Sequence, residues 1–441
     1  MKLKITPTKK LQGEITAPPS KSYSHRAFIA SSLTKGVSLI KNPLISGDVE
    51  VTIDILRSLG HRISRVSDNT YMVKSYLETI KSIKSILDCK NSGTSIRIFS
   101  ALAMLIDGGL SFSGEFFKRK RPIVPLLNAL EYIGGTYDLT ENFLSIKRKG
   151  KKCNTIELPG NISSQFVSAL LMMCPLLNCK KNNSITVKIT SPITSYPYVK
   201  ITLDVLSSFR IKIHESLDDK KVGRYDIVTG QNYRAQTYEI PGDFSSASFL
   251  IVAAIISPED SNIVINNLNF DKPQGDQEII EILQNMGAKI EVYRDKNSIS
   301  INGNINKYPL TGLAINIEDT PDLFPILSVV GAFAKGKTEL YNASNIRGKE
   351  SDRISIVAQE LSKMGVKVKE EEDKLTIYHC DQLEGIDINH EHDHRVAMAF
   401  TVASLFAKTP SQISDIEVVK DSYPNFIEDM KQLGAKVDLI K

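Results

Sequence analysis

The sequence predicts an α/β protein built from one supersecondary unit that is repeated six times. In each copy a helix pattern ends at a turn residue and a strand pattern follows, with the turn at Gly60, Gly134, Arg210, Gly287, Gly365 and Gly434. The spacings between these positions are 74, 76, 77, 78 and 69 residues. A second segment, in which polar residues open an apolar helix pattern, precedes each turn. Repeats of this length are too long for solenoid turns.

The second helix of each unit is amphipathic. In the fifth copy Ile354, Val357, Leu361 and Met364 follow the spacing of one helix face. Gly365 then ends the helix, because glycine accepts the left-handed conformation. Val366 and Val368 alternate with a lysine, which is typical of a half-buried strand. Each copy therefore reads as strand, helix, strand, helix, strand.

The leading helices are apolar on nearly all sides. The runs SALLMMCPLL, ASFLIVAAII and VAMAFTVASLF show this best, so we expect central buried helices with the sheets outside. Six copies divide naturally into two domains of three. Pro18-Pro19 and Pro241-Gly242 mark two candidate crossings, which give a discontinuous first domain of residues 1–19 plus 241–441 and a second domain of residues 20–240. We expect the substrate cleft between them.

Composition narrows the class of protein. The longest wholly apolar run, residues 249–256, is too short to span a bilayer, and the N-terminus has no signal-peptide pattern. We therefore expect a cytoplasmic protein. The five cysteines lack paired CxxC spacing, so we expect neither a disulfide framework nor a zinc site, with Cys174 and Cys179 as packing residues. The net charge of +5 is weak and comes without a nucleic-acid-binding motif.

The starts of the leading helices carry residues that hold anions. A helix N-terminus offers free N–H donors and about half a positive charge. The polar residues at these starts are Lys21, Ser22, His25, Arg26, Asn91, Gly93, Thr94, Arg97, Ser163, Ser164, Gln165, Asp322, Asp393, His394 and Arg395. The fourth copy, GDFSSAS, has no cation, and we interpret it as plain N-capping. Several such starts together predict a site for a small molecule with several negative charges.

A second set of loops, before the second helix of each copy, adds further polar residues. They include Lys118–Arg121, Ser195, Tyr198, and the segment NIRGKESDR at 345–353. This segment places cations at a helix start, where they oppose the helix dipole. A bound anion would remove that conflict, so we interpret the segment as functional.

Alternating histidines at 390, 392 and 394 allow a metal hypothesis. Neither a cysteine nor a typical metal-site spacing accompanies them, and Asp393 and Arg395 fit an anion site better. We therefore expect no metal.

The motifs together resemble one family. SKSYSHRA, NSGTSIR, SSQF, SYPY, PDLF, NIRGKESDR and DHRVAMAF are similar, in order, to the motifs of the 3-phosphoshikimate 1-carboxyvinyltransferase (EPSP synthase) family. The resemblance implies two domains, each of three βαβαββ units, in an inverse α/β barrel arrangement. It implies transfer of the enolpyruvyl group of phosphoenolpyruvate to the 5-hydroxyl of shikimate 3-phosphate, with release of phosphate. It also implies the shikimate pathway of aromatic amino-acid biosynthesis and no cofactor.

The resemblance assigns roles residue by residue. Shikimate 3-phosphate would be held by Lys21, Ser22, Arg26, Ser163, Ser164, Gln165, Ser195, Tyr198, Asp322, Asn345 and Lys349. Phosphoenolpyruvate would be held by Lys21, Gly93, Arg121, Gln165, Arg353 and Arg395. Asp322 would deprotonate the attacking hydroxyl, and Glu350 or Lys21 would protonate the methylene carbon. Lys420 stands one residue before the position where relatives can carry a lysine, which is Asp421 here.

Glyphosate, for which Gly93 leaves room in the family, is the expected inhibitor, and we expect a monomer that binds neither nucleic acid nor membrane. Two alternatives remain open. One is the sister UDP-N-acetylglucosamine enolpyruvyltransferase, although the loop GEFFKRKRP lacks the cysteine of that enzyme. The other is a non-catalytic basic repeat protein that binds nucleic acid, which would need stacking aromatics that the motifs lack.

Overall fold

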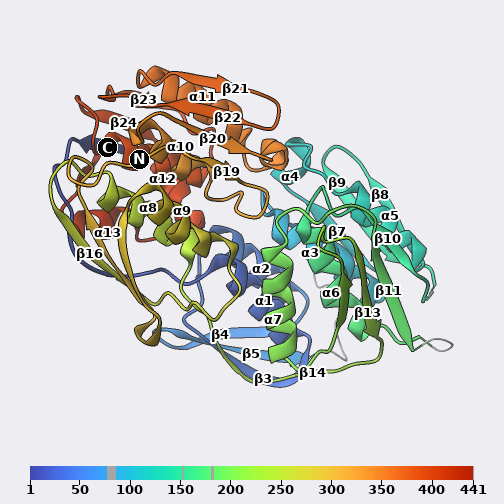
Figure 1. Cartoon of the computed structure of the whole chain (residues 1–441). Coiled ribbons are helices and arrows are strands. Elements are labelled where there is room, and N and C mark those ends of the chain that lie inside the picture. Colours follow the sequence, from blue (N-terminus) through green and yellow to red (C-terminus); the bar gives the residue numbers. More distant parts are fainter. Residues whose placement is uncertain (77–85, 151–152, 180–182, 441) are drawn as a thin grey trace. The chain divides into compact units, whose positions relative to one another are not determined.

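The computed structural model describes residues 1–76, 86–150, 153–179 and 183–440. The chain forms two compact units (Figure 1). Met1–Pro18 and Pro241–Lys441 make up one, called the terminal unit, and Pro19–Ile240 make up the other, called the middle unit. Each unit has its own hydrophobic core. The α/β class expected from the repeats is confirmed.

The middle unit contains three sheets and the helices that lie between their strands in the sequence. The first is formed by α1 (Lys21–Ser32), β3 (Thr34–Lys41), α2 (Gly47–Ser58), β4 (Arg62–Ser67), β5 (Thr70–Tyr76), β14 (Tyr233–Arg234) and β15 (Thr237–Glu239). The second is formed by β6 (Leu87–Asp88), α3 (Gly93–Leu102), β7 (Leu110–Ser113), α4 (Glu115–Lys118), α5 (Val124–Tyr132), β8 (Gly135–Leu139) and β9 (Phe143–Arg148). The third is formed by β10 (Ile156–Leu158), α6 (Ser164–Met173), β11 (Ser184–Ile189), α7 (Pro197–Ser208), β12 (His214–Leu217) and β13 (Gly223–Val228).

The terminal unit repeats this plan with three further sheets. The first is formed by β2 (Gln12–Thr16), α8 (Phe244–Ile255), β16 (Ser261–Asn266), α9 (Glu278–Met286), β17 (Lys289–Tyr293) and β18 (Ser298–Gly303). The second is formed by β19 (Ala314–Asn316), α10 (Phe324–Phe333), β20 (Lys337–Tyr341), α11 (Arg353–Lys363), β21 (Val368–Glu370) and β22 (Leu375–Tyr378). The third is formed by β1 (Lys2–Thr6), β23 (Asp387–Ile388), α12 (His394–Ser404), β24 (Ser411–Ser414), α13 (Phe426–Gln432) and β25 (Lys436–Ile440).

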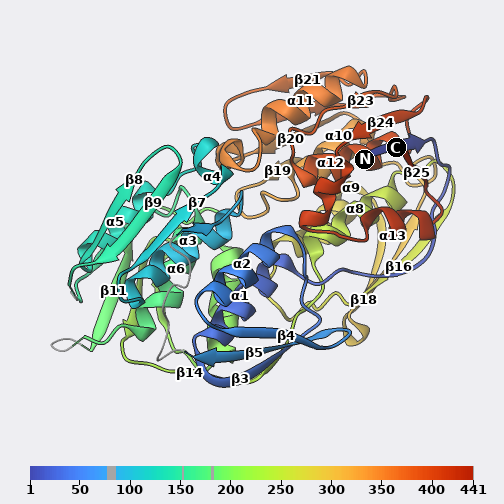
Figure 2. The same cartoon turned by 180° about the vertical axis from the view of Figure 1, so that it is seen from behind.

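The sheets share one topology. In four of the six sheets two parallel strands are joined by the leading helix, as in a βαβ unit, and the later strands are antiparallel. Strands that are distant in sequence complete three of the sheets, because β15 pairs with β3, β2 pairs with β16, and β1 lies between β24 and β25. The chain ends therefore lie side by side, as both views show (Figure 2).

The leading helices are buried, as their apolar sequences predict. Every residue of α8 and of α12 is buried, and these two helices pack on each other and on α10. In the middle unit α3 packs on α6, while α1 packs on α7. The polar N-terminal turns of these helices are thus held by a rigid core, and this core positions the site.

The six turn residues all adopt the left-handed conformation. Gly60, Gly134, Gly287, Gly365 and Gly434 have φ between 91° and 114°, and Arg210 takes the same place with φ 67°. The repeat positions read from the sequence therefore correspond to one recurring helix end.

One expectation about the cysteines is wrong. The structure joins Cys153 and Cys179 by a disulfide, with their Cα atoms 5.9 Å apart. The two residues are 26 positions apart and sit on segments that only the packed third repeat brings together, so the spacing rules for short motifs could not reveal the pair. Cys174 is a buried free thiol, as expected.

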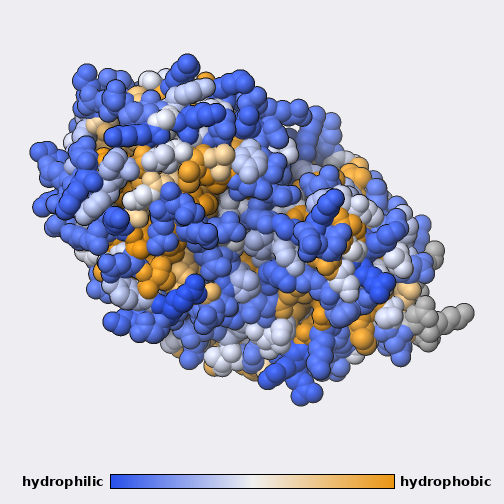
Figure 3. Space-filling view, viewed as in Figure 1, coloured by the Kyte–Doolittle hydropathy of each residue, from blue (hydrophilic) through white to orange (hydrophobic). Residues whose placement is uncertain are grey.

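The surface is mostly hydrophilic on the face drawn in Figure 3, with apolar residues in separate patches. Among the described residues, no helix has the length and apolar character that crossing a membrane requires.

Candidate active site

Arg353 is the centre of an ion-pair cluster in the terminal unit. It opens α11, and its side chain is 1% exposed. Its Nη1 lies 2.8 Å from Asp322 Oδ1, its Nη2 lies 2.9 Å from Glu350 Oε2, and its Nε lies 2.8 Å from Asp393 Oδ2. Burial lowers the pKa of Arg353, but the carboxylates of Asp393, Glu350 and Asp322 outweigh burial and raise it well above its usual value. The guanidinium is therefore permanently charged.

Asp322 links this arginine to a second one. Its Oδ2 lies 3.0 Å from Arg395 Nη2, and the ammonium of Lys349 approaches Oδ1 at 3.9 Å. Asp322 stands just before α10, and Arg395 is in the first turn of α12. The structure thus brings together Asp322, Lys349, Glu350, Arg353 and Arg395, all five of which were singled out from the sequence.

Asp393 has a structural part in this cluster. It is the N-cap of α12, where its Oδ1 accepts hydrogen bonds from the backbone N–H groups of Arg395 and Val396. Burial alone would raise the pKa of this carboxyl, but the charge of Arg353 lowers it below the usual value. Asp393 therefore stays ionised and holds Arg353 through its Nε, while Asp322 contacts Nη1.

The cations of the segment 345–353 have carboxylate neighbours within the protein, and the functional interpretation of this segment stays a prediction. Arg347 pairs with Asp352 at 2.8 Å and with Glu370 at 3.0 Å. Asp352 also caps α11. Asp352, five positions away, and Glu370, 23 positions away, thus offset the charge of Arg347 before this helix.

A second cluster lies in the middle unit around Gly93, the first residue of α3. A Cβ atom at this glycine would lie 2.9 Å from Arg121 Nη2 and 3.1 Å from Arg97 Nη1. Arg97 also donates from Nη1 to Gln165 Oε1 at 2.6 Å and from Nη2 to the Pro122 carbonyl at 2.7 Å. The rings of Phe116 and Phe166 lie 5.3 and 5.4 Å from its guanidinium carbon. Gly93, Arg121 and Gln165, which were predicted separately, therefore converge.

Arg26 of α1 is buried and already hydrogen-bonded. It donates to Thr202 Oγ1 at 2.7 Å, to the Ser22 carbonyl at 2.9 Å and to the Tyr198 carbonyl at 3.3 Å. Burial lowers its pKa to about 10. The structure brings Ser22, Arg26 and Tyr198 together, and the role of Arg26 toward a substrate carboxylate stays a prediction.

Lys21 begins α1 and is only partly covered, with 15% of its side chain exposed and Asp48 Oδ2 at 3.5 Å from its Nζ. His25, on the same helix, is buried, and its Nδ1 lies 2.7 Å from Thr52 Oγ1. Burial, then Lys21 and Arg26, lower the pKa of His25 well below its usual value, so it is neutral. His25 is therefore a packing residue of this helix start.

The remaining predicted residues lie at helix starts or in loops. Ser163 caps α6 through the backbone N–H of Gln165, at 3.3 Å, and Ser164 is buried beside it. Ser195 is buried in the loop before α7 with φ 55°. Asn345 is half-buried near the start of the segment Ser344–Gly348, and Lys420 is exposed in Ile416–Asp421.

Sequence reasoning missed two residues. Arg97 was noted at a helix start but received no role, although it binds Gln165. Asp276 was not noted at all. It lies in Gly275–Gln277, at the position in the fourth repeat that matches the start of α11 in the fifth. An alignment of the six repeats against one another would have found it.

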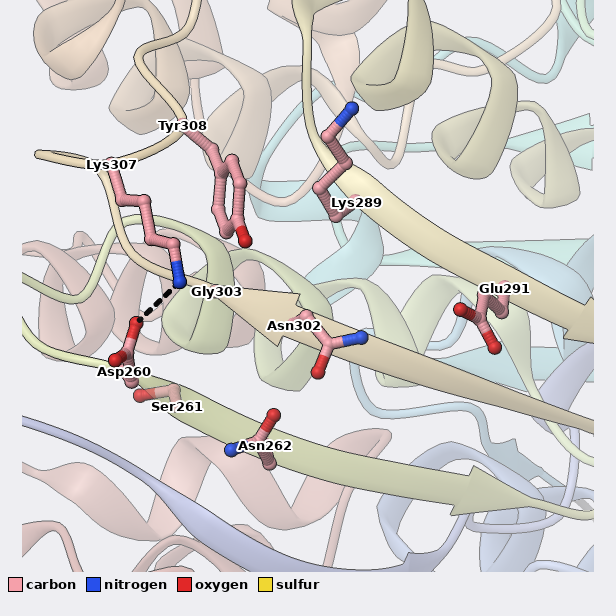
Figure 4. A pocket seen from close by; sticks show the side chains of 9 residues that line it. All are labelled: Asp260, Ser261, Asn262, Lys289, Glu291, Asn302, Gly303, Lys307 and Tyr308. Atoms are coloured by element: carbon pink, nitrogen blue, oxygen red, sulfur yellow. Dashed lines mark ion pairs between the residues drawn. The ribbon is translucent and has the colours of Figure 1, made fainter.

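Two further features lie outside these clusters. Within the described ranges, no group of three or more His, Cys, Asp or Glu side chains is arranged to hold a metal ion. A cavity of about 390 Å³ opens on the outer face of β16, β17 and β18, lined among others by Asp260, Lys289 and Tyr308 (Figure 4). None of the predicted site residues lines it.

Comparison with known proteins identifies the family. Residues 5–430 match the family model described as EPSP synthase (3-phosphoshikimate 1-carboxyvinyltransferase). The chain belongs to the EPSP synthase family. Relatives named 3-phosphoshikimate 1-carboxyvinyltransferase include one from Methanococcus maripaludis strain C5, 39% identical over 443 residues, covering 99% of this chain and 100% of that protein. Another, from Methanocaldococcus jannaschii, is 40% identical over 446 residues and covers 99% of each chain.

Solved structures agree with this assignment. EPSP synthase from Acinetobacter baumannii has a TM-score of 0.81 and 25% identity, with full coverage of both chains. The enolpyruvyl transferase NikO from Streptomyces tendae has a TM-score of 0.78 at 16% identity, covering 99% of this chain and 98% of that chain, and so shares the fold.

Proposed function

We propose that the protein transfers the enolpyruvyl group of phosphoenolpyruvate to the 5-hydroxyl of shikimate 3-phosphate and releases phosphate. Membership of the EPSP synthase family supports this reaction. Among the residues, the main support for this reaction is the position of Asp322. Its two carboxylate oxygens face two different buried arginines. A carboxylate held in this way is a base with fixed orientation, placed between cations that suit anionic substrates.

Both substrates carry a phosphate and a carboxylate, so their binding needs several cations and N–H donors. For phosphoenolpyruvate we propose Lys21, Gly93, Arg121, Gln165, Arg353 and Arg395. For shikimate 3-phosphate we propose Lys21, Ser22, Arg26, Ser163, Ser164, Gln165, Ser195, Tyr198, Asp322, Asn345 and Lys349. Glyphosate is the proposed inhibitor.

The chemistry is an addition followed by an elimination. Asp322 accepts the proton of the 5-hydroxyl as its oxygen attacks C2 of phosphoenolpyruvate, while Glu350 or Lys21 donates a proton to the methylene carbon. The tetrahedral adduct then loses a methyl proton and phosphate, which restores the double bond. Arg353 holds Glu350 at 2.9 Å and Asp322 at 2.8 Å, so one guanidinium orients both the acid and the base. Substrate anions that bind Arg353 and Arg395 draw these cations away from Asp322 and free its oxygens to accept a proton.

The experiment that tests this function is phosphate release from phosphoenolpyruvate, measured with shikimate 3-phosphate and with UDP-N-acetylglucosamine as alternative acceptors. We expect release with the first acceptor and none with the second. Release only with the sugar nucleotide would assign the sister activity, and release with neither would overturn the proposal.

A further inference from the structure

Asp276 lies beside the ion-pair cluster of the terminal unit but is not a member of any ion pair described there. It belongs to Gly275–Gln277, which packs on the N-terminal part of α8 and leads into α9. Its side chain is buried, with the residue 4% exposed. A buried carboxyl needs hydrogen-bond donors or a cation for both of its oxygens if it is to be ionised.

The two oxygens of Asp276 have different surroundings. Oδ2 accepts a short hydrogen bond from the hydroxyl of Ser245, in the first turn of α8. Oδ1 is buried and has no hydrogen-bond partner among the described residues. An ionised Asp276 would therefore leave a charged oxygen without a donor, which costs more free energy than a neutral O–H in the same place.

The charges around Asp276 also favour its protonated form. Burial is the largest influence, and it raises the pKa of this carboxyl. The charges of Asp322 and of the helix cap Asp243 raise this pKa further, whereas the charge of Arg395 lowers it. The resulting pKa of Asp276 is about 7. On α9, the other element that packs on this segment, Glu278 and Glu281 are exposed acids. Asp276 and Asp322 are thus two carboxyls that compete for the same arginine.

We propose that Asp276 is a positioning residue of the active site, whose protonated form keeps Arg395 directed to Asp322 and to the substrate. With Asp276 neutral, the cations Arg353, Arg395 and Lys349 balance the carboxylates Asp322, Glu350 and Asp393. An ionised Asp276 would add a negative charge that attracts Arg395 away from Asp322 and repels two anionic substrates. This inference rests on the proposed function, because it deepens the account of that same site.

The test compares the wild type with Asp276→Asn, which has the shape of the protonated acid and cannot ionise. The measured quantity is kcat/KM for phosphoenolpyruvate between pH 6 and pH 8.5. We expect kcat/KM of the wild type to fall as the pH rises across this range. The factor of this fall should be at least ten times the factor for Asp276→Asn. Glu281→Gln, which removes an exposed acid from α9, is the matched control and should follow the wild type. Parallel profiles for the wild type and Asp276→Asn would overturn the inference.

A second measurement does not depend on turnover. The infrared spectrum of the wild type at pH 6 should contain the C=O band of a buried protonated carboxyl, which disappears as the pH is raised and is absent from Asp276→Asn. Ser245→Ala removes the donor that favours the ionised form, so the band should persist to higher pH in that variant. A wild-type spectrum without the band at pH 6 would overturn the inference. If all variants and the wild type fail to release phosphate while the band behaves as expected, the proposed function fails and the protonation of Asp276 stands.

Discussion

Arg353 and Asp322 are 31 positions apart in the chain, yet Nη1 of the arginine donates to Oδ1 of the aspartate at 2.8 Å. The arginine is at the start of α11, and the aspartate precedes α10. Arg395 occupies the other oxygen of the same carboxylate, at 3.0 Å. The proposed role of Asp322 as the base, with both of its oxygens held by arginines, leads to the first prediction.

Asp322→Ala should reduce kcat by about 100-fold or more, the usual contribution of a positioned general base. The physical reason is loss of the proton acceptor, together with a buried arginine charge that keeps only part of its compensation. The measurement is steady-state phosphate release with both substrates. Asp381→Asn is the control, since that carboxylate is fully exposed and pairs with the side chain of His379. A loss below tenfold, about 1.4 kcal/mol of barrier, would show that Asp322 is not the base.

Glu350→Gln and Asp352→Ala test two acids that are two residues apart with different partners. Glu350 pairs with Arg353 inside the cluster, whereas Asp352 pairs with Arg347 and caps α11. We expect Glu350→Gln to lower kcat at least tenfold with little change in stability. Asp352→Ala should lower the free energy of unfolding by about 1 kcal/mol and leave kcat within threefold. Kinetics and urea unfolding of both variants separate the two outcomes, and equal kinetic losses would contradict the assignment of Glu350.

Gly93→Ala should raise KM for phosphoenolpyruvate and weaken inhibition by glyphosate. The new methyl group would lie 2.9 Å from Arg121 Nη2 and 3.1 Å from Arg97 Nη1, so both guanidinium groups must shift. Inhibition constants and KM are the measurements. Gly150→Ala is the matched control, because a Cβ atom there meets nothing within 4 Å. Unchanged constants in Gly93→Ala would mean that Arg121 moves without consequence for the substrate.

Arg210→Gly should stabilise the protein by roughly 0.5–1 kcal/mol. Arg210 is exposed and has φ 67°. This conformation costs a residue with a Cβ atom about 1–2 kcal/mol. Glycine avoids that cost, but its greater conformational entropy in the unfolded chain cancels part of the gain. Gly60→Arg is the reverse change, at the equivalent position of the first repeat, with open space around the Cβ position. It should destabilise by a similar amount. Thermal unfolding measures both, and a lower melting temperature for Arg210→Gly would be inconsistent with strain at this residue.

Asp276→Asn should change the pH dependence of stability. The pKa of Asp276 is raised from 3.8 to about 7, so between these values the folded protein keeps a proton that the unfolded chain releases. The stability of the wild type therefore falls as pH rises through this window, and the variant lacks this loss. The free energy of unfolding of Asp276→Asn, relative to that of the wild type, should rise by at least about 1.4 kcal/mol between pH 4 and pH 8. This amount is the equivalent of one pKa unit. Urea unfolding at the two pH values measures the gain, and a constant difference would refute it.

Local patterns were enough to predict the fold class and much of the candidate site. The helix ends at Gly60 to Gly434 were readable because glycine at a helix end leaves a sequence signal of its own. Residues at helix starts, such as Gly93 and Arg395, were readable because capping and anion binding depend on the first turn alone. The motif set also carried the family resemblance.

Pairing between remote segments was decided only by the tertiary structure. The pairing of Arg347 with Glu370, the joining of Cys153 to Cys179, and the contact of Ser245 with Asp276 all depend on how the helices and strands of one repeat pack together. The charge state of a carboxyl such as Asp276 depends on burial and on neighbours brought close by folding, and no local pattern encodes either. The sequence by itself determined which residues stand at the helix starts, whereas packing of the buried helices decided which charges neutralise one another, because electrostatic energy depends on distance in space and on exclusion of water.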